Sequence, residues 1–206
     1  MSINFLEINN ATFAASKKNK VLDFNLTIKN EGEIICLLGP SGIGKTTILR
    51  SIAGLQKIPK GEIHLKGTLL SSENKHIEPE KRNIALSFQD NSLFPHYTIL
   101  ENINFGAKRN RQSKYSFKID ELIKLLHLEG LGDKYPHQIS AGEAQRVSLA
   151  RSLMSKPKLL LLDEPFSNID QSLKVELQQN IKKILKEKKN YDNYCDSRFL
   201  RGFLYG

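Results

Sequence analysis

The chain has 206 residues, 39% of them hydrophobic, and a formal net charge of +9. This length and hydrophobic content are sufficient for one domain with a hydrophobic core. No apolar run approaches the roughly 20 residues that a membrane span needs. We expect no signal peptide, and the two cysteines, Cys36 and Cys195, have no metal-binding or redox spacing. The positive charge is diffuse, with five lysines between 182 and 189, so a solvated surface is favoured over a nucleic-acid interface.

The first stretch, residues 5–66, has β-strand patterns and contains a glycine-rich loop that reads GPSGIGKTT. The apolar run EIICLL precedes this loop and the helical pattern TTILRSIAG overlaps its end, which disfavours an ordinary turn and indicates a P-loop. Its glycines let backbone N–H groups surround a phosphate at a helix N-terminus. Lys45 would contact the β and γ phosphates of ATP, and the hydroxyl of Thr46 would bind Mg²⁺. The predicted binding residues here are Gly39, Pro40, Ser41, Gly42, Ile43, Gly44, Lys45, Thr46 and Thr47.

Residues 84–88 form a predicted strand that ends at Gln89, and from about 95 to 154 the pattern becomes helical. Within this region SAGEAQ begins at Ser140 and opens a predicted helix over 142–154. Ser140 and Glu143 fit a capping box, and the same helix N-terminus can also serve as an anion site.

The run LLLLDE, Leu159–Glu164, ends in two carboxylates and is typical of a strand that is buried on both faces. By itself it could be a core strand followed by two solvated acids. Together with a P-loop, it makes Asp163 the expected acid at the Mg²⁺ and Glu164 the candidate base that polarises the attacking water.

These three motifs, in this order, resemble the ATP-binding cassette (ABC) ATPases over about residues 5–189. The resemblance implies an α/β fold: a P-loop core with a mostly parallel sheet, an antiparallel β subdomain, and a helical subdomain over 95–154. It also implies that ISAGEAQR is the family signature, in which Ser140 and Gly142 contact the nucleotide held by a second subunit. Ala141 and Glu143 depart from the usual glycine and glutamine.

The resemblance implies further roles. Gln89 would reach Mg²⁺ and the attacking water, Asp170 would lie in a loop that crosses a dimer interface, and Leu93–Leu100 would face the transporter. Phe13 is the candidate for stacking on adenine, although an aromatic residue between short strands is more often part of the core.

The segments LFPHYTILENINFG and KYPHQIS most resemble ATPases of bacterial importers for ferric iron, or for similar ions, polyamines or sugars. The resemblance implies a head-to-tail dimer at the cytoplasmic face of the cell membrane. The dimer would bind transmembrane permease subunits and, indirectly, a solute-binding protein. A soluble ABC ATPase of DNA repair or translation is disfavoured, because neither a coiled-coil insertion nor a second cassette occurs here, and no nucleic-acid partner is expected.

Residues 190–206 do not match the family, which places one more strand and then a histidine after Glu164; all five histidines precede that residue. Codons for this tail, read one base out of frame, can encode a β-branched run, His-Asp with the histidine at Ser197, and Glu-Ala. We therefore expect an ABC ATPase domain over 1–189 and an out-of-frame tail, with the last core strand missing. Low stability and slow turnover would follow, so an inactive remnant is a further alternative.

Overall fold

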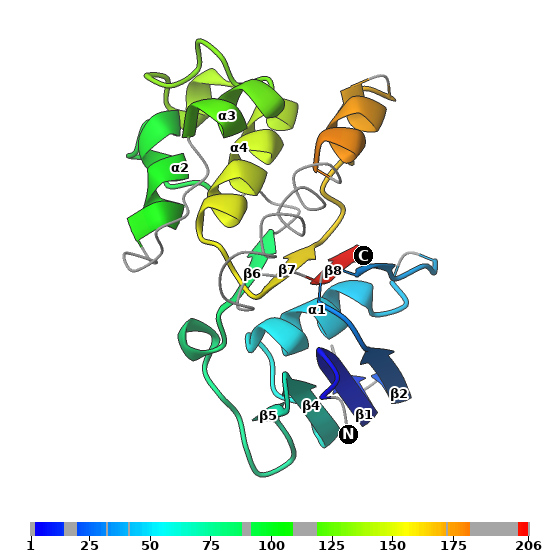
Figure 1. Cartoon of the computed structure of the whole chain (residues 1–206). Coiled ribbons are helices and arrows are strands. Elements are labelled where there is room, and N and C mark those ends of the chain that lie inside the picture. Colours follow the sequence, from blue (N-terminus) through cyan, green and yellow to red (C-terminus); the bar gives the residue numbers. More distant parts are fainter. Residues whose placement is uncertain are drawn as a thin grey trace. The chain divides into compact units, whose positions relative to one another are not determined.

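The computed structural model describes residues 3–14, 20–31, 33–40, 42–87, 92–108, 119–171, 173–181 and 202–205. The chain forms two compact units (Figure 1). The first contains Met1–Leu86, Lys158–Asp163 and Leu200–Gly206, and the second contains Ser87–Pro157 and Glu164–Phe199. Within the described ranges, no helix has the length and apolar character that crossing a membrane requires.

An antiparallel sheet of the first unit has the strand order β2-β1-β4-β5. It comprises β1 (Leu6–Ala14), β2 (Lys20–Ile28), β4 (Lys60–Leu65) and β5 (Thr68–Ser71). In β1 the side chains of Leu6, Ile8, Ala11 and Phe13 are all buried, because the register shifts between Ile8 and Ala11 and reverses the alternation of faces. The predicted antiparallel subdomain is thereby confirmed.

A second sheet has the strand order β3-β8-β7-β6. Its strands are β3 (Ile34–Cys36), β8 (Gly202–Tyr205), β7 (Leu159–Leu162) and β6 (Ile84–Ser87). β8 runs parallel to both of its neighbours, β3 and β7.

The prediction that the last core strand is missing is wrong, because β8 occupies the position between β3 and β7. Leu204 pairs with Ile35 on one side and with Leu161 on the other. An empty position would leave N–H and C=O groups of both flanking strands unpaired, and any extended segment that reaches it can pair with them. The residue types of the tail do not indicate this strand, because its position is set by the pairing groups of β3 and β7.

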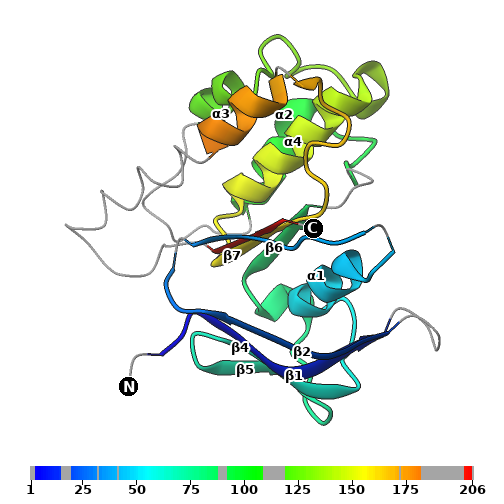
Figure 2. The same cartoon turned by 90° about the vertical axis from the view of Figure 1, so that its right-hand side faces the viewer.

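Helix α1 (Lys45–Ala53) lies between the two sheets (Figure 2). Ile48, Leu49 and Ile52 are buried, and they share one apolar cluster with Phe13 of β1 and Leu161 of β7. Burial of this helical stripe against both sheets fixes the helix that follows the P-loop.

The second unit is helical, which confirms the predicted helical subdomain. It contains α2 (Ile99–Lys108), α3 (Ile119–Leu125) and α4 (Ala141–Met154), together with helical residues 173–181. Helices α2 and α4 approach closely at Gly106, where a Cβ atom would lie 2.2 Å from the carbonyl oxygen of Arg151. Asn180 donates to the carbonyl of Leu125 and joins the later helix to α3.

Candidate nucleotide-binding site

The P-loop connects β3 to α1 in the first unit. Gly42 and Gly44 have φ values of 81° and 109°, a backbone region that strains residues with a side chain. Gly44 is also the N-cap of α1, and a Cβ atom there would lie 2.7 Å from Cγ2 of Val21. Both the conformation and the surroundings therefore require glycine at 44. Ser41 lies outside the described residues.

Lys45 is the first residue of α1, and its ammonium turns back over the loop. Nζ donates to the carbonyl oxygens of Gly39 at 2.9 Å and Pro40 at 3.3 Å. No side chain caps this helix end and its first turn contains no acidic residue. A cation and the N-terminus of a helix thus lie together, which suits a phosphate. Thr46 is exposed beside them, whereas the side chain of Thr47 is buried.

A pocket of about 210 Å³ lies beside the P-loop, and Lys45 contributes a positive charge to its lining. Phe24 and Val21 of β2 line it, together with Ile43 of the loop. The prediction that Phe13 stacks on adenine is wrong: its side chain has no exposed surface and packs edge-on against Phe24, with ring centroids 5.7 Å apart. Phe24 is the aromatic residue that lines the pocket, and the sequence pattern did not single it out.

Asp163 directly follows β7 and belongs to the same unit as the P-loop. Because β3 and β7 both run parallel to β8, their carboxyl ends lie at one edge of the sheet. Asp163 lies at this edge, and the P-loop starts from it. Asp163 is buried, with 6% of its surface exposed. Glu164 belongs to the second unit, is exposed, and has a φ of 47°. Gln89 lies outside the described residues.

The signature segment opens α4 in the second unit, and the predicted capping box is present. Ser140 Oγ accepts from the backbone N–H of Glu143 at 3.2 Å, and the Glu143 carboxylate accepts from the backbone N–H of Ser140 at 2.7 Å. The hydrogen bond from the Ser140 N–H, with a smaller contribution from the Ser140 side chain, lowers the pKa of Glu143 from its usual 4.5. Asp170 is exposed, and its carbonyl accepts from the backbone N–H of Lys174.

Comparison with known proteins decides the family. The protein-family model described as ABC transporter matches residues 21–167, which include the P-loop, the signature and both acids. The chain belongs to the ATP-binding family of ABC transporters.

Curated relatives of this ABC transporter chain include three import ATP-binding proteins. An Fe(3+) ions import protein, FbpC of Fusobacterium nucleatum, is 42% identical over 89% of this chain and 48% of its own length. A sulfate/thiosulfate import protein, CysA of Synechocystis, is 41% identical over 86% of this chain and 49% of its own length. A spermidine/putrescine import protein, PotA of Haemophilus influenzae, is 42% identical over 80% of this chain and 44% of its own length. The chain spans about half the length of these relatives.

A solved structure with a similar fold is a dimeric ATP-binding cassette in a post-hydrolysis state, bound to ADP and phosphate. It has a TM-score of 0.78 and 26% sequence identity, covering 97% of this chain and 87% of the other. The α/β fold expected for an ABC ATPase is thus confirmed.

In this ABC transporter chain, Arg82 holds the far end of the P-loop helix, a role that the sequence pattern did not indicate. The side chain is 2% exposed, and Nη1 donates to the carbonyl oxygens of Ser51 and Ile52, each at 3.0 Å. Nε donates to Ile77 O at 2.6 Å and Nη2 to Ser71 Oγ at 2.7 Å. Burial lowers the pKa of Arg82 to about 10, so the guanidinium is charged at neutral pH. This positive charge interacts favourably with the C-terminal end of the helix dipole of α1.

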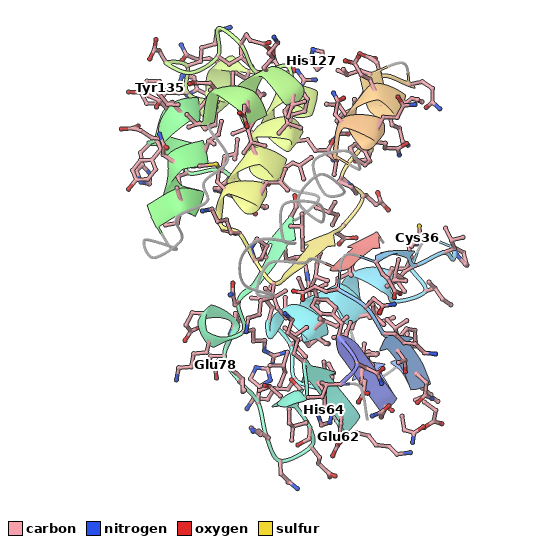
Figure 3. The ribbon with its side chains drawn as sticks, viewed as in Figure 1. Cys36, Glu62, His64, Glu78, His127 and Tyr135 are labelled. Carbon is pink, nitrogen blue, oxygen red and sulfur yellow. The ribbon has the colours of Figure 1, made fainter. Side chains whose placement is uncertain are left out.

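Across the described part of the chain, no three His, Cys, Asp or Glu side chains form a cluster that could hold a metal ion. His64 and Glu62 lie together on β4 (Figure 3), 2.8 Å apart, but form only a pair. Thr46 and Asp163 offer the hard oxygen ligands that Mg²⁺ prefers, and Mg²⁺ commonly takes its remaining ligands from nucleotide phosphates and water. These two residues therefore fit a Mg²⁺ that arrives with ATP.

Proposed function

We propose that this chain is the ATP-binding subunit of an ABC importer, which couples ATP hydrolysis to the uptake of a solute through membrane permease subunits. One observation supports this most directly. The P-loop, with Lys45 over its carbonyls, and the buried acid Asp163 follow two strands of one sheet at the same edge.

In the proposed reaction the residues have separate tasks. Lys45 and the N-terminus of α1 bind and orient the phosphates of ATP. Thr46, Asp163 and Gln89 would hold Mg²⁺, which supplies charge neutralisation when bound. Glu164 orients a water molecule and accepts a proton from it as the water oxygen bonds to the γ-phosphorus. The bond from the γ-phosphorus to the β,γ-bridging oxygen breaks at the same time, so ADP leaves and inorganic phosphate is formed.

A second subunit would complete each site in a head-to-tail dimer. Ser140 and Gly142 of one subunit would face the nucleotide of the other, and Asp170 would lie at the interface. The similar solved cassette is itself dimeric, which supports this arrangement.

The membrane partner would dock on Leu93–Leu100, at the cytoplasmic face of the cell membrane. Phe94, Tyr97 and Phe105 form an aromatic cluster there, in which the Phe94 ring lies 4.6 Å from Phe105 and 5.4 Å from Tyr97. Phe105 is 40% exposed and Phe94 and Tyr97 are half-buried, and aromatic side chains that remain accessible favour protein contacts.

Ferric iron is the proposed solute, delivered to the permease by a solute-binding protein outside the cell. The names of the Fusobacterium and Escherichia coli relatives, both Fe(3+) import proteins, support iron. The sulfate and polyamine relatives have similar identity, so uptake by vesicles that contain the permease must be compared for all three solutes.

We also propose that residues 1–189 are the part of the ABC ATPase domain that follows the family sequence, with a helical part over 95–154. We propose that residues 190–206, which include the sheet strand β8, are read out of frame. Their departure from the family pattern supports this. Reading the nucleotides around Lys189 decides it, since the absence of a His-Asp codon pair in the neighbouring frame refutes the frame change.

The test of function uses the purified full chain, a fluorescent ATP analogue and phosphate release. We expect Mg²⁺-dependent binding and hydrolysis, and binding weakened by about tenfold or more in Lys45→Ala, because a charge-assisted phosphate contact is lost. Lys57→Ala, at an exposed lysine of the same unit, is the matched control. Equal binding by both variants contradicts the proposal. Binding without hydrolysis supports the inactive remnant, and salt-sensitive DNA binding supports the repair alternative.

A further inference from the structure

Gln145 is a buried amide on α4 that forms three hydrogen bonds with one loop. The side chain is 2% exposed. Its Nε2 donates to the carbonyl oxygen of Glu164 at 2.8 Å and to Ser167 Oγ at 3.3 Å. Its Oε1 accepts from the backbone N–H of Asn168 at 3.2 Å. One side chain thus satisfies a donor and two acceptors of residues 164–168, and Glu164 is the candidate base.

The backbone of this loop has an unusual conformation at Glu164. A φ of 47° places a residue with a side chain in the left-handed region, which costs free energy and persists only where neighbouring groups enforce it. The Glu164 carbonyl that Gln145 holds also accepts from the backbone N–H of Ser167 at 3.2 Å and closes a turn. Because the carbonyl and the side chain of Glu164 leave the same residue, fixing one restricts the directions open to the other.

Helix α4 also touches the loop through its backbone. A Cβ atom on Gly142 would lie 2.7 Å from the carbonyl oxygen of Asn168. The signature helix and the loop therefore meet at two points, at Gly142 and at Gln145, about one helical turn apart.

We propose that Gln145 is a positioning residue for hydrolysis, which sets the direction of the Glu164 side chain by holding the Glu164 carbonyl and the Asn168 N–H. The inference rests on the proposed function, in which Glu164 is the base. In the proposed dimer the signature serves the partner's nucleotide and Glu164 serves its own. Gln145 then connects the two nucleotide sites within one chain, because a shift of α4 would displace the loop that carries the base.

The first arm of the test is hydrogen exchange of the full chain. Gln145→Met keeps the length of the side chain and removes its hydrogen bonds, and Gln178→Met is the matched control at an exposed glutamine. We expect the backbone N–H of Asn168 to exchange about tenfold faster in Gln145→Met and to be unchanged in the control. Unchanged exchange in Gln145→Met overturns the inference, whatever the activity.

Gln145→Glu distinguishes the role of the amide oxygen from the role of the amide N–H groups. It also replaces Gln145→Met as the test variant if Gln145→Met does not fold. A glutamate keeps an oxygen for the Asn168 N–H but has no donor for the Glu164 carbonyl. We expect near-normal exchange at Asn168 together with slower turnover. Normal turnover in Gln145→Glu overturns the positioning of Glu164.

The second arm is a double-mutant cycle on ATP hydrolysis. We expect Gln145→Met to lower kcat by about tenfold and to leave KM within about twofold, because the phosphate-binding residues belong to the P-loop. In a Glu164→Ala background the same substitution should leave the residual kcat unchanged, because the group that it positions is gone. Additive effects overturn the inference. A wild-type chain that does not hydrolyse ATP contradicts the proposed function instead, and the exchange arm alone then decides whether Gln145 holds the loop.

Discussion

Gly142 lies so close to Asn168 that a Cβ atom on the glycine would be 2.7 Å from the asparagine carbonyl oxygen. The family resemblance explains this glycine by the close approach of a partner's nucleotide. The structure shows a second cause inside the chain, because the signature helix packs directly against the loop that follows β7.

Gly142→Ala should therefore destabilise the fold by about 1–3 kcal/mol, although alanine favours helices, because α4 or the loop must shift. Gly132→Ala is the matched control: its Cβ atom would meet only Leu100, at an ordinary 3.8 Å. The control should change the free energy of unfolding by less than about 0.5 kcal/mol. Urea unfolding measures both, and equal stability of the two variants would show that the contact is not tight.

Arg82→Met should destabilise the first unit by about 2–4 kcal/mol, because carbonyl groups of Ser51, Ile52 and Ile77 lose a buried donor. Arg82→Lys should be nearly as harmful, since one ammonium cannot replace the forked guanidinium. Arg50→Met, at an exposed arginine of α1, the helix whose last carbonyls Arg82 holds, is the control for thermal unfolding. An Arg82→Lys variant with wild-type stability would contradict the inference that the forked guanidinium is needed to hold the end of α1.

The capping box should make stability depend on pH through Glu143. Its pKa is lowered in the folded state, so its contribution is present above 4.5 and is lost as the pH falls through the folded value. Glu143→Gln, which does not titrate, should give a shallower fall in unfolding free energy between about pH 5 and 3. Identical slopes in urea unfolding would refute the assignment.

Ser140→Ala tests the other half of the box. Removing the hydroxyl that accepts from the Glu143 N–H should cost about 1 kcal/mol at neutral pH. Ser140→Thr, which keeps a hydroxyl, should cost less in the same unfolding measurement.

Leu204→Pro should destabilise the first unit by about 3 kcal/mol or more, because β8 has a strand on each side and proline removes a ladder donor. Leu204→Val keeps the N–H and suits a strand, so it should cost about 1 kcal/mol or less. Proline and valine variants with the same unfolding temperature would show that residues 202–205 do not complete the sheet.

Phe13 shows where prediction from the sequence failed. Phe13 was expected between short strands, whereas it lies within β1, and the face it occupies depends on a register shift between Ile8 and Ala11 that no residue type signals. The prediction that the central strand is missing failed for a related reason. The position of β8 is set by the hydrogen-bonding edges of β3 and β7, and both strands are distant from β8 in sequence.

Residue types and their spacing were enough to predict the P-loop, the strand that precedes Asp163, and the capping box of Ser140 with Glu143. Each depends on residues a few positions apart, whose backbone geometry is local. The folded chain was needed to reveal the contacts of Gln145 with the Glu164 loop, of Arg82 with the end of α1, and of Gly142 with Asn168. These pairs are joined by packing of a helix against a distant loop or strand, and burial is what makes their hydrogen bonds and close approaches necessary.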